Sequence, residues 1–394
     1  MENKVLRYSL FGLLYFVQGA VLSFFTALNA IYLLSFNVSM GQIGIMGLIA
    51  MIPFVIKIFL GMLSDKVNLL GLGYRKPYII LGLIIQAVCL VGVAFVNPGT
   101  HFWLYALTAF LLMMGMALYD TATDGLALDT TPKEEEGFIQ GFMVGGRALG
   151  IVIISAVIGI LVEAQSWQYA FWFLAIVSLI PLILVFLLKE AERTAEREFD
   201  WKAFSAFKYW PIIALGILGA LYSLIINASN QIVNPYLQKL FGLGPKQLGF
   251  YTMYWGIGVV VGSLLGGKLV DKLGQKRSVF IAMIASFISI LLFLVIPNTI
   301  IAIAIVVLFG FGFGYYETVY LALSMEKSDP RIAASMFSIF MAVANVGTGI
   351  GLALSGTLVD SLDYPLTFLI IAGLNLLAIP LIPAVFGKGK KRTA

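Results

Sequence analysis

The sequence predicts an all-α membrane protein with twelve transmembrane helices, arranged as two pseudo-symmetric halves of six. Three observations support this fold class. Of the 394 residues, 60% are hydrophobic and 11% are charged, against roughly 25% charged residues in soluble domains. Apolar stretches long enough to cross a hydrocarbon layer of about 30 Å recur along the chain. Short motifs of the first half also return in the second, as YDT (119–121) does in YET (316–318).

The predicted helices follow from these apolar stretches, taken in chain order. The first six cover residues 7–35, 41–64, 77–97, 102–129, 138–162 and 168–188. The second six cover residues 209–238, 246–270, 276–297, 299–325, 332–360 and 365–386. The first stretch is too long for a signal peptide and lacks a small-residue cleavage pattern, so we expect no cleavable leader. The single cysteine, Cys89, excludes an internal disulfide.

Basic residues lie in alternate loops, which predicts the orientation in the membrane. Twelve crossings put both termini on one side, and that side holds most of the Lys and Arg residues. The opposite loops NVSMG, VNPGTH, EAQSWQ, IPNT and DSLDYP hold neither. The loop with Lys239 and Lys246 is the exception. By the positive-inside rule, both termini are expected to be cytoplasmic, in a prokaryotic inner membrane.

The long charged segment 189–208 divides the twelve helices six and six. We therefore predict an N-terminal half (1–188), a linker (189–208), a C-terminal half (209–388) and a basic cytoplasmic tail (389–394). Aromatic residues alternate with lysines in FDWKAFSAFKYW, which favours an amphipathic helix in the membrane interface. A disordered linker is the alternative.

A charged motif occurs at the same place in each half, after the second helix. In the second half it reads GGKLVDKLGQKR (266–277), and the first half carries an interrupted copy from GMLSDKV to GYRK (61–76). The motif residues we single out as a gate are Gly61, Asp65, Arg75, Gly267, Asp271 and Arg277. With these motifs the chain resembles the major facilitator superfamily. That resemblance implies a secondary transporter that works by alternating access around a site between the halves.

Five ionisable residues lie inside predicted helices, where a charge costs several kcal/mol unless it has a partner or faces water: Lys57, Asp120, Asp124, Arg147 and Glu317. At 1.5 Å per residue, Lys57, Asp120 and Glu317 fall roughly 5 Å from the centres of their helices, toward the cytoplasm. Asp124 follows Asp120 on the same helix face. Two acids one turn apart do not both ionise easily in a dry site, so one interpretation is a proton-coupling role. Static ion pairs with Lys57 and Arg147 are the alternative.

The two cations have two interpretations. Either Lys57 or Arg147 is able to hold an anionic group of a substrate or to lock a carboxylate. For Arg147 we favour the lock, because a guanidinium offers fixed bidentate geometry to Asp. For Lys57 the sequence leaves both interpretations open.

The superfamily resemblance implies that the first, fourth, seventh and tenth helices line the central cavity. On that basis Asp120 and Glu317, which occupy equivalent positions in the two halves, are expected to face one another across the pathway. The candidate substrate-binding residues, besides Lys57, are Gln18, Asn227, Asn230, Asn234, Tyr315, Tyr316 and Tyr320. Hydrogen bonding between helices is the alternative role for the asparagines.

A narrower resemblance covers the fourth and fifth helices. The residues that carry it are Asp120, Asp124, Asp129, Pro132, Glu134, Glu135, Gly137, Arg147 and Gly150, with Lys57 and YFVQG (15–19). This pattern resembles the peptide/acetyl-CoA/drug transporter family, which includes muropeptide permeases of the AmpG type. Glu136 and Tyr119 depart from it, standing where the family has Arg and Gln. The resemblance implies a proton-driven importer of an amphipathic or anionic molecule.

We therefore expect a secondary active transporter, with proton-coupled symport of a small amphipathic or anionic solute. A drug or lipid exporter of the same fold is one alternative, and a non-transporting membrane receptor or scaffold is another. An enzyme is not expected, because the chain has one Cys and one His and so no Cys/His metal set. We expect no cofactor besides the proton gradient. The expected partners are a small-molecule substrate and the lipid bilayer, with no nucleic acid, and the expected state is a monomer.

Overall fold

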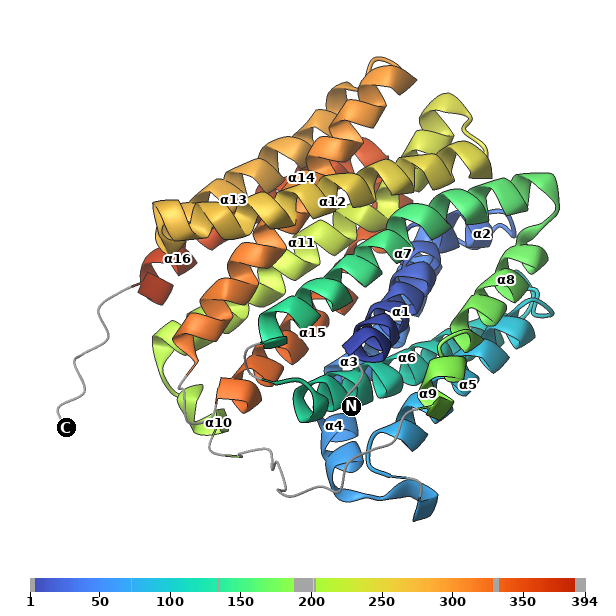
Figure 1. Cartoon of the computed structure of the whole chain (residues 1–394). Coiled ribbons are helices and arrows are strands. Elements are labelled where there is room, and N and C mark those ends of the chain that lie inside the picture. The colour runs from blue at the N-terminus through green and yellow to red at the C-terminus, as the bar shows by residue number, and fades with distance from the viewer. Residues whose placement is uncertain are drawn as a thin grey trace. The chain divides into compact units, whose positions relative to one another are not determined.

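The computed structural model describes residues 4–71, 73–132, 135–187, 201, 203–328 and 333–386. Within these ranges the chain forms helices joined by short loops and contains no strand, as the predicted all-α class requires (Figure 1). The predicted amphipathic linker lies mostly outside the described residues, and the described part holds one helical turn, α10 (Ala203–Ala206). The basic tail 389–394 also lies outside them.

The helices of the first half follow the predicted stretches closely. Their bounds are α1 (Lys4–Ser23), α2 (Asn29–Leu34), α3 (Met40–Val55), α4 (Lys57–Lys66), α5 (Lys76–Val93), α6 (Phe102–Thr130), α7 (Glu136–Ala164), α8 (Trp167–Leu179) and α9 (Leu182–Leu187). One π-helical turn, η1 (Phe24–Leu28), joins α1 to α2, and a short 3-10 turn, η2 (Leu69–Gly71), follows α4.

The helices of the second half also follow the predicted stretches. Their bounds are α11 (Trp210–Phe241), α12 (Pro245–Leu273), α13 (Gln275–Leu291), α14 (Thr299–Lys327), α15 (Ala333–Leu374) and α16 (Ala378–Phe386). The 3-10 turns η4 (Leu292–Val295) and η5 (Asn375–Leu377) extend α13 and join α15 to α16.

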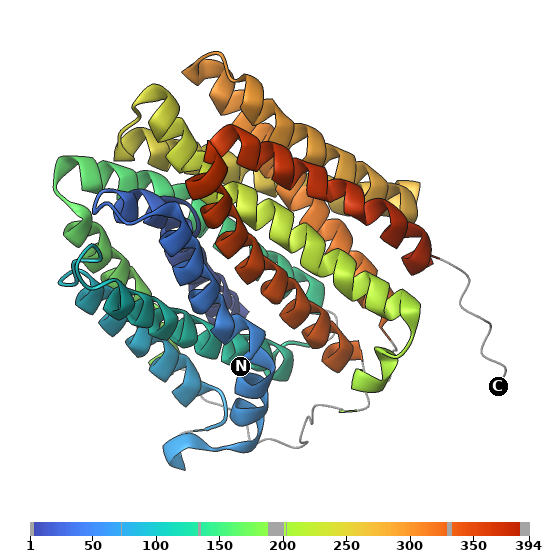
Figure 2. The ribbon, with the colours of Figure 1, turned by 180° about the vertical axis from the view of Figure 1, so that it is seen from behind.

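Eleven helical segments of the described chain are long and apolar enough to cross a membrane. The last, Ser335–Phe386, has 52 residues, which at 1.5 Å per residue is more than twice the roughly 30 Å of hydrocarbon. Its helix breaks at Asp363, whose φ of 70° is not helical, and Pro365 follows. Figure 2 shows the chain reversing direction within this segment. The segment therefore holds two crossings, and the twelve predicted crossings are accounted for.

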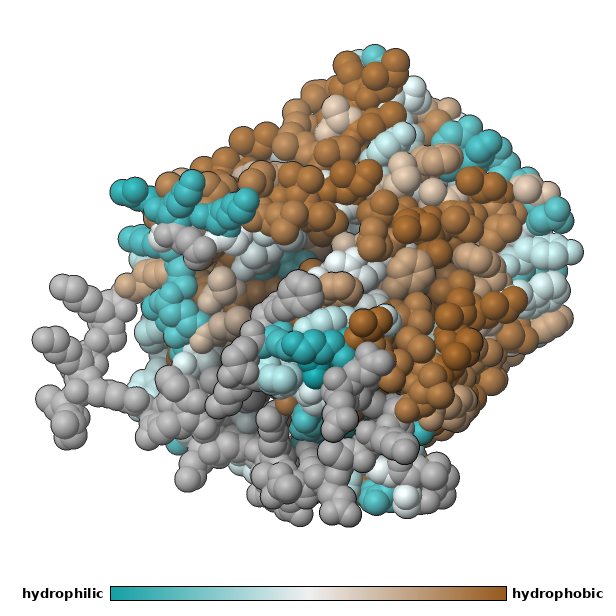
Figure 3. All heavy atoms as spheres, in the orientation of Figure 1, coloured by the Kyte–Doolittle hydropathy of each residue, from teal (hydrophilic) through white to brown (hydrophobic). Residues whose placement is uncertain are grey.

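The outer surface matches a lipid environment. Large apolar side chains are exposed along the middle of the helices, including Val88, Ile153 and Leu264. Figure 3 shows hydrophobic residues over the middle of this face and hydrophilic residues toward the helix ends. Since water is absent from the hydrocarbon core, such a surface is favourable only where acyl chains cover it.

The chain forms two compact units. Unit 1 comprises Met1–Ser39, Ile49–Glu198 and Leu237–Met253, and unit 2 comprises Met40–Leu48, Phe199–Tyr236 and Tyr254–Ala394. Within unit 1, glycines bring α1 and α7 into backbone contact, because a Cβ at Gly19 would overlap the carbonyl oxygen of Arg147. Close approach through small residues is the usual way in which membrane helices pack.

Equivalent motifs of the two halves also make equivalent helix contacts. In unit 1, GILVE (159–163) on α7 packs against the start of α12, where a Cβ on Gly159 would lie 2.8 Å from the carbonyl oxygen of Pro245. In unit 2, GTLVD (356–360) on α15 packs against the start of α3. There the Asp360 carboxylate accepts hydrogen bonds from the backbone N–H groups of Met40 (3.0 Å) and Gly41 (2.8 Å). A carboxylate at a helix N-terminus satisfies free donors and complements the helix dipole.

Candidate functional site

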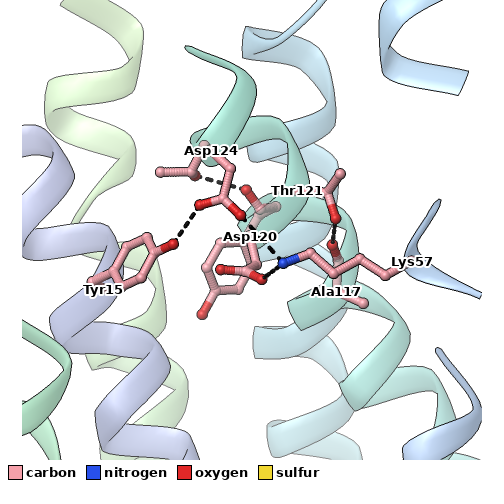
Figure 4. Close-up of polar contacts among 8 residues, drawn as sticks. Tyr15, Lys57, Ala117, Asp120, Thr121 and Asp124 are labelled. Carbon is pink, nitrogen blue, oxygen red and sulfur yellow. Dashed lines mark hydrogen bonds and ion pairs between the residues drawn. The ribbon is translucent and has the colours of Figure 1, made fainter. Parts of the chain in front are cut away.

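Four side chains from three elements of unit 1 meet at what we name the carboxylate cluster: Tyr15, Lys57, Asp120 and Asp124 (Figure 4). Tyr15 comes from α1, Lys57 is the first residue of α4, and both acids come from α6. Three of the four were predicted from the sequence as intramembrane candidates. The structure brings them into direct contact.

The two acids share one face of α6 because they are four residues apart on a helix of 3.6 residues per turn. α6 is fixed against α5 by glycines, since a Cβ on Gly82 would lie 2.5 Å from the carbonyl oxygen of Gly115. The Asp120 side chain is 5% exposed and the Asp124 side chain is 38% exposed. The pair therefore consists of one buried and one accessible carboxylate.

Lys57 reaches both acids from a break in its helix. α3 ends at Val55, and Ile56, with φ −86° and ψ 5°, separates it from α4. Pro53 lies just before the break; a proline inside a helix lacks one N–H and clashes with the carbonyl four residues earlier. The Lys57 ammonium forms an ion pair with Oδ2 of Asp120 and a second one, at 3.2 Å, with Oδ2 of Asp124. Of its two interpretations, the structure thus shows the contact with carboxylates.

Tyr15 is the cluster residue that the sequence analysis did not single out for a role. Its hydroxyl donates a hydrogen bond to Oδ1 of Asp124. Figure 4 shows this hydroxyl on one side of Asp124 and the Lys57 ammonium on the other. The available signal was its place on α1 three residues before Gln18, on the same helix face. A tyrosine in an apolar helix gives no further sign of a partner.

Arg147 lies on α7, whose backbone packs against Gly19 of α1. Its charge interacts electrostatically with Tyr15. Lys57 therefore contacts both acids directly, and Arg147 adds a positive charge from α7.

A second cluster of unit 1 contains the first copy of the gating motif. We name it the Arg75 cluster, formed by Arg75, Asp65, Asp129 and Ser64. Arg75 Nη2 lies 2.5 Å from Asp65 Oδ1, Nε lies 3.1 Å from Asp129 Oδ2, and Nη1 donates to Ser64 Oγ at 2.7 Å. The guanidinium crosses α6 at Gly125, where a Cβ would overlap it. Asp129, one of the residues that carry the narrower family resemblance, is thus an ion-pair partner of the motif arginine.

The remaining gating residues lie on α4, α12 and α13. Gly61 lies against α6, since a Cβ there would be 3.1 Å from Cγ2 of Thr121. Gly267 lies on α12 and has no heavy atom within 4 Å of an added Cβ. Arg277 is exposed on α13, and the Asp271 side chain lies outside the described residues. Gly274, between these two helices, has a φ of 76°, which favours glycine.

The candidate amides of unit 2 lie on α11, and Asn227 contacts α15. Its Nδ2 donates to the backbone oxygen of Ser223 (2.9 Å) and to Oγ1 of Thr348 (3.2 Å). These are contacts within and between helices, the alternative role. Asn230 and Asn234 are buried, with 6% and 4% exposure.

The candidate residues on α14 of unit 2 are mostly buried. Tyr315, Tyr316 and Tyr320 are each 1% exposed, and the Tyr320 hydroxyl donates to the backbone oxygen of Phe340 at 3.2 Å. Glu317, on the same helix, is half-buried.

Three of the candidate substrate-binding residues each have a buried polar atom without a hydrogen-bond partner in the part of the chain that the structure describes. These atoms are Oε1 of Gln18, in unit 1, and the hydroxyls of Tyr315 and Tyr316, in unit 2. A buried polar group without a partner costs free energy, so each is suited to bind a polar ligand group or water. Over the same described residues, no group of three or more His, Cys, Asp or Glu side chains is arranged to hold a metal ion.

Comparison with known families agrees with this architecture. The sequence model of the Major Facilitator Superfamily matches residues 11–336 and, in a second alignment, 215–393. The chain belongs to the major facilitator superfamily. The predicted major facilitator fold is thereby confirmed, and the chain is a multi-pass membrane transporter of this superfamily.

Individual relatives are distant. The chain is 23% identical over 357 residues to the putative transporter AmpG 1 of Rickettsia bellii, covering 84% of this chain and 87% of that protein. It is 24% identical over 261 residues to the anhydromuropeptide permease of Escherichia coli, covering 62% of this chain and 51% of that protein. It is 22% identical over 238 residues to the sialic acid transporter NanX of Escherichia coli, covering 58% and 56%. The match therefore spans only about half of each of the last two proteins. The resemblance to AmpG-like permeases is confirmed.

Solved structures show the same fold. The nucleoside transporter NupG superposes with a TM-score of 0.81 at 17% identity, covering 99% of this chain and 100% of that chain. The D-xylose-proton symporter superposes with a TM-score of 0.76 at 17% identity, covering 96% of each chain.

Proposed function

We propose that this transporter is a proton-coupled symporter of a small amphipathic or anionic solute, driven by the proton gradient through alternating access. The observation that carries the proposal is the sharing of one ammonium, that of Lys57, by the carboxylates of Asp120 and Asp124. The proposal keeps the predicted division into halves 1–188 and 209–388, with cytoplasmic termini and a monomeric state.

The charge balance of this contact supports proton binding. Two ionised carboxylates and one ammonium leave a net charge of −1 among the three groups in contact. An uncompensated charge within the membrane costs several kcal/mol, although Asp124 keeps some exposure that lowers the cost. Binding one proton makes the three groups neutral. Proton binding and release therefore switch these three groups between a neutral state and a state with a net charge of −1.

The solute class is supported by the cations and by the relatives. Lys57 is 30% exposed, and Arg147 on α7 carries a second positive charge of unit 1. Such groups are suited to an anionic group of a solute. The relatives named as an anhydromuropeptide permease and a sialic acid transporter support candidates of that kind. The unpartnered Gln18 and Tyr316 atoms supply hydrogen-bonding groups, one in each unit.

The proposal is tested in two stages with purified protein. A thermal-shift screen at two pH values first compares anhydromuropeptides, sialic acid, sugars, nucleotides, coenzyme A esters and lipids. The solute that stabilises the protein is then added to proteoliposomes that contain a trapped pH-sensitive dye. We expect solute entry to acidify the lumen. Asp120→Asn should abolish gradient-driven uptake while the protein stays folded, because Lys57 then has no carboxylate partner in the cluster when Asp124 binds a proton.

The control variant is Glu163→Gln, which removes a half-exposed carboxylate of unit 1 outside the cluster and should transport as the unmodified chain does. Solute uptake that proceeds equally with and without a proton gradient would contradict the coupling. So would wild-type uptake by Asp120→Asn with an unchanged pH dependence. Binding without uptake or exchange would instead identify a receptor.

A further inference from the structure

We infer that Asp124 is the carboxylate that exchanges its proton, at Oδ2 and in competition with Lys57, and that Tyr15 is the positioning residue that holds Asp124. This inference rests on the proposed proton coupling and names the acid and the atom that carry it.

Access to water separates the two acids. The Asp120 side chain is 5% exposed, whereas the Asp124 side chain, one turn further along α6, is 38% exposed. A proton that is exchanged with an aqueous pathway has to reach the carboxylate. Asp124 is the more exposed of the two and so is better placed for this exchange, whereas the buried Asp120 is suited to be the permanent counter-charge of Lys57.

The two oxygens of Asp124 have different partners. Oδ1 accepts a hydrogen bond from the Tyr15 hydroxyl, and Oδ2 lies 3.2 Å from Lys57 Nζ. An ammonium has three donors and no acceptor. When a proton binds Oδ2, that oxygen becomes an O–H donor facing another donor, and the contact with Lys57 is lost.

Release of Lys57 from Asp124 does not strand its charge, because Asp120 Oδ2 remains its ion-pair partner. The proton comes from water, Lys57 keeps all three of its own, and no other bond is made or broken. Oδ1 stays an acceptor in the neutral acid, so the Tyr15 bond persists. In the ionised state Asp124 thus connects α1 and α4, and in the protonated state it is bound to α1 alone.

The charged and titratable groups described around this exchange come from four helices: α1, α4, α6 and α7. Lys57 faces Asp124 from α4, Asp120 from α6 itself and Tyr15 from α1, while Arg147 acts on Tyr15 from α7. Tyr15 touches Asp124 through its hydroxyl and takes no proton in the proposed step.

The test reads the protonated carboxyl group directly, without transport. Infrared difference spectra between acid and neutral pH are recorded on the full chain in liposomes, for wild type, Asp120→Asn and Asp124→Asn. Each variant leaves Lys57 with one carboxylate, which favours folding. We expect the titrating carboxyl C=O band of wild type to persist in Asp120→Asn and to vanish in Asp124→Asn.

Loss of the band in Asp120→Asn, alone or together with its loss in Asp124→Asn, would overturn the inference. In that case proton-coupled uptake in proteoliposomes would still stand. The proposed function would fail instead if uptake ignored the proton gradient, whatever the spectra show.

Tyr15→Phe tests the positioning role. The Tyr15 hydrogen bond stabilises the ionised carboxylate, so its loss makes Asp124 hold its proton more tightly. We expect the midpoint of the band to move to higher pH by about one unit. Tyr8→Phe is the matched control, since Tyr8 also lies on α1 and donates to a carboxylate, that of Glu135, outside the cluster. A midpoint that is equal in Tyr15→Phe and Tyr8→Phe would overturn the role of Tyr15.

Discussion

Two clusters in unit 1 each pair carboxylates within one small group of side chains, but with different cations. In the carboxylate cluster, Lys57 at the start of α4 contacts Asp120 and Asp124, both on α6. In the Arg75 cluster, Arg75 at the N-terminus of α5 contacts Asp65 of α4 and Asp129 of α6. Each cluster therefore has one cation and two carboxylates, and each connects α6 to α4.

The cations differ in how firmly they hold. Arg75 is a planar fork with five donors, its side chain is 6% exposed, and it uses three of its nitrogens on three different side chains. Lys57 is a compact charge on a flexible stem, its side chain is 30% exposed, and it uses one nitrogen on two acids. A fork with several fixed bonds suits a clamp, whereas a point charge with two acceptors is able to move between them.

The largest expected effect comes from removing the exchanging acid. Asp124→Asn keeps the shape of the side chain but cannot ionise, so gradient-driven uptake should fall to the level of liposomes without protein. Exchange of labelled solute across a membrane with no gradient should continue, because the remaining ion pair of Lys57 with Asp120 is intact. Parallel uptake and exchange assays measure the two activities. Gradient-driven uptake at the wild-type rate by Asp124→Asn would contradict the proton-exchanging role of the carboxylate cluster.

Removing the Arg75 guanidinium should lower the free energy of unfolding and leave the coupling of uptake to protons unchanged. Arg75→Ala removes the Arg75 guanidinium from the carboxylates of Asp65 and Asp129, which are 21% and 27% exposed. We expect a loss of about 2–4 kcal/mol, the range for breaking a largely buried pair from one side, reduced for this exposure. Unfolding in detergent by denaturant measures it, with Lys272→Ala on the surface of α12 as the control. An unchanged unfolding midpoint would show that Arg75 is not a clamp.

Replacing the lysine of the carboxylate cluster by an arginine should make that cluster hold Asp124 more firmly, as Arg75 holds its partners. Lys57→Arg places a bidentate fork beside Asp120 and Asp124, so a proton competes with a stronger partner for Asp124. The pH at which uptake is half-maximal should fall, because a higher proton concentration is needed to displace the guanidinium. Uptake measured over a pH series checks this, and a pH profile that superposes on wild type would contradict the competition.

The smallest effect is expected at a third group of ion pairs, which has one carboxylate and two cations instead of two carboxylates and one cation. Glu135 accepts from Lys4 (2.5 Å), Arg7 and Tyr8, so one acid serves two cations. The bonds from Lys4 and Tyr8, and the charges of Lys4 and Arg7, lower the pKa of Glu135. Its contribution to stability is thus present above the unfolded pKa of about 4.3 and is lost as the pH falls through the lowered folded value.

Thermal unfolding of wild type and Glu135→Gln over an acidic pH series measures this contribution. The difference in melting temperature should be small above about pH 5 and should shrink further on acidification. A difference that grows as the pH falls would have the wrong sign.

The number of crossings and the residues placed within them could be predicted from the sequence alone. Twelve apolar stretches, the interrupted one at Asp363 included, follow from a requirement that is local to each stretch: enough apolar residues to span the hydrocarbon. The depths of Lys57 and Asp120 follow in the same way, because each is a count of residues along one helix.

The choice of partners depended on the tertiary structure. Sequence reasoning left Lys57 open between a substrate and a carboxylate, and it gave neither Asp129 nor Tyr15 a partner. Those outcomes depend on how each helix is rotated and how closely it approaches its neighbours, which the contacts at Gly82 and Gly125 and the break after Pro53 decide. A hydropathy pattern sets how deep a side chain lies in the membrane. Only packing between helices sets which atoms it meets there, because that contact joins residues far apart in the chain.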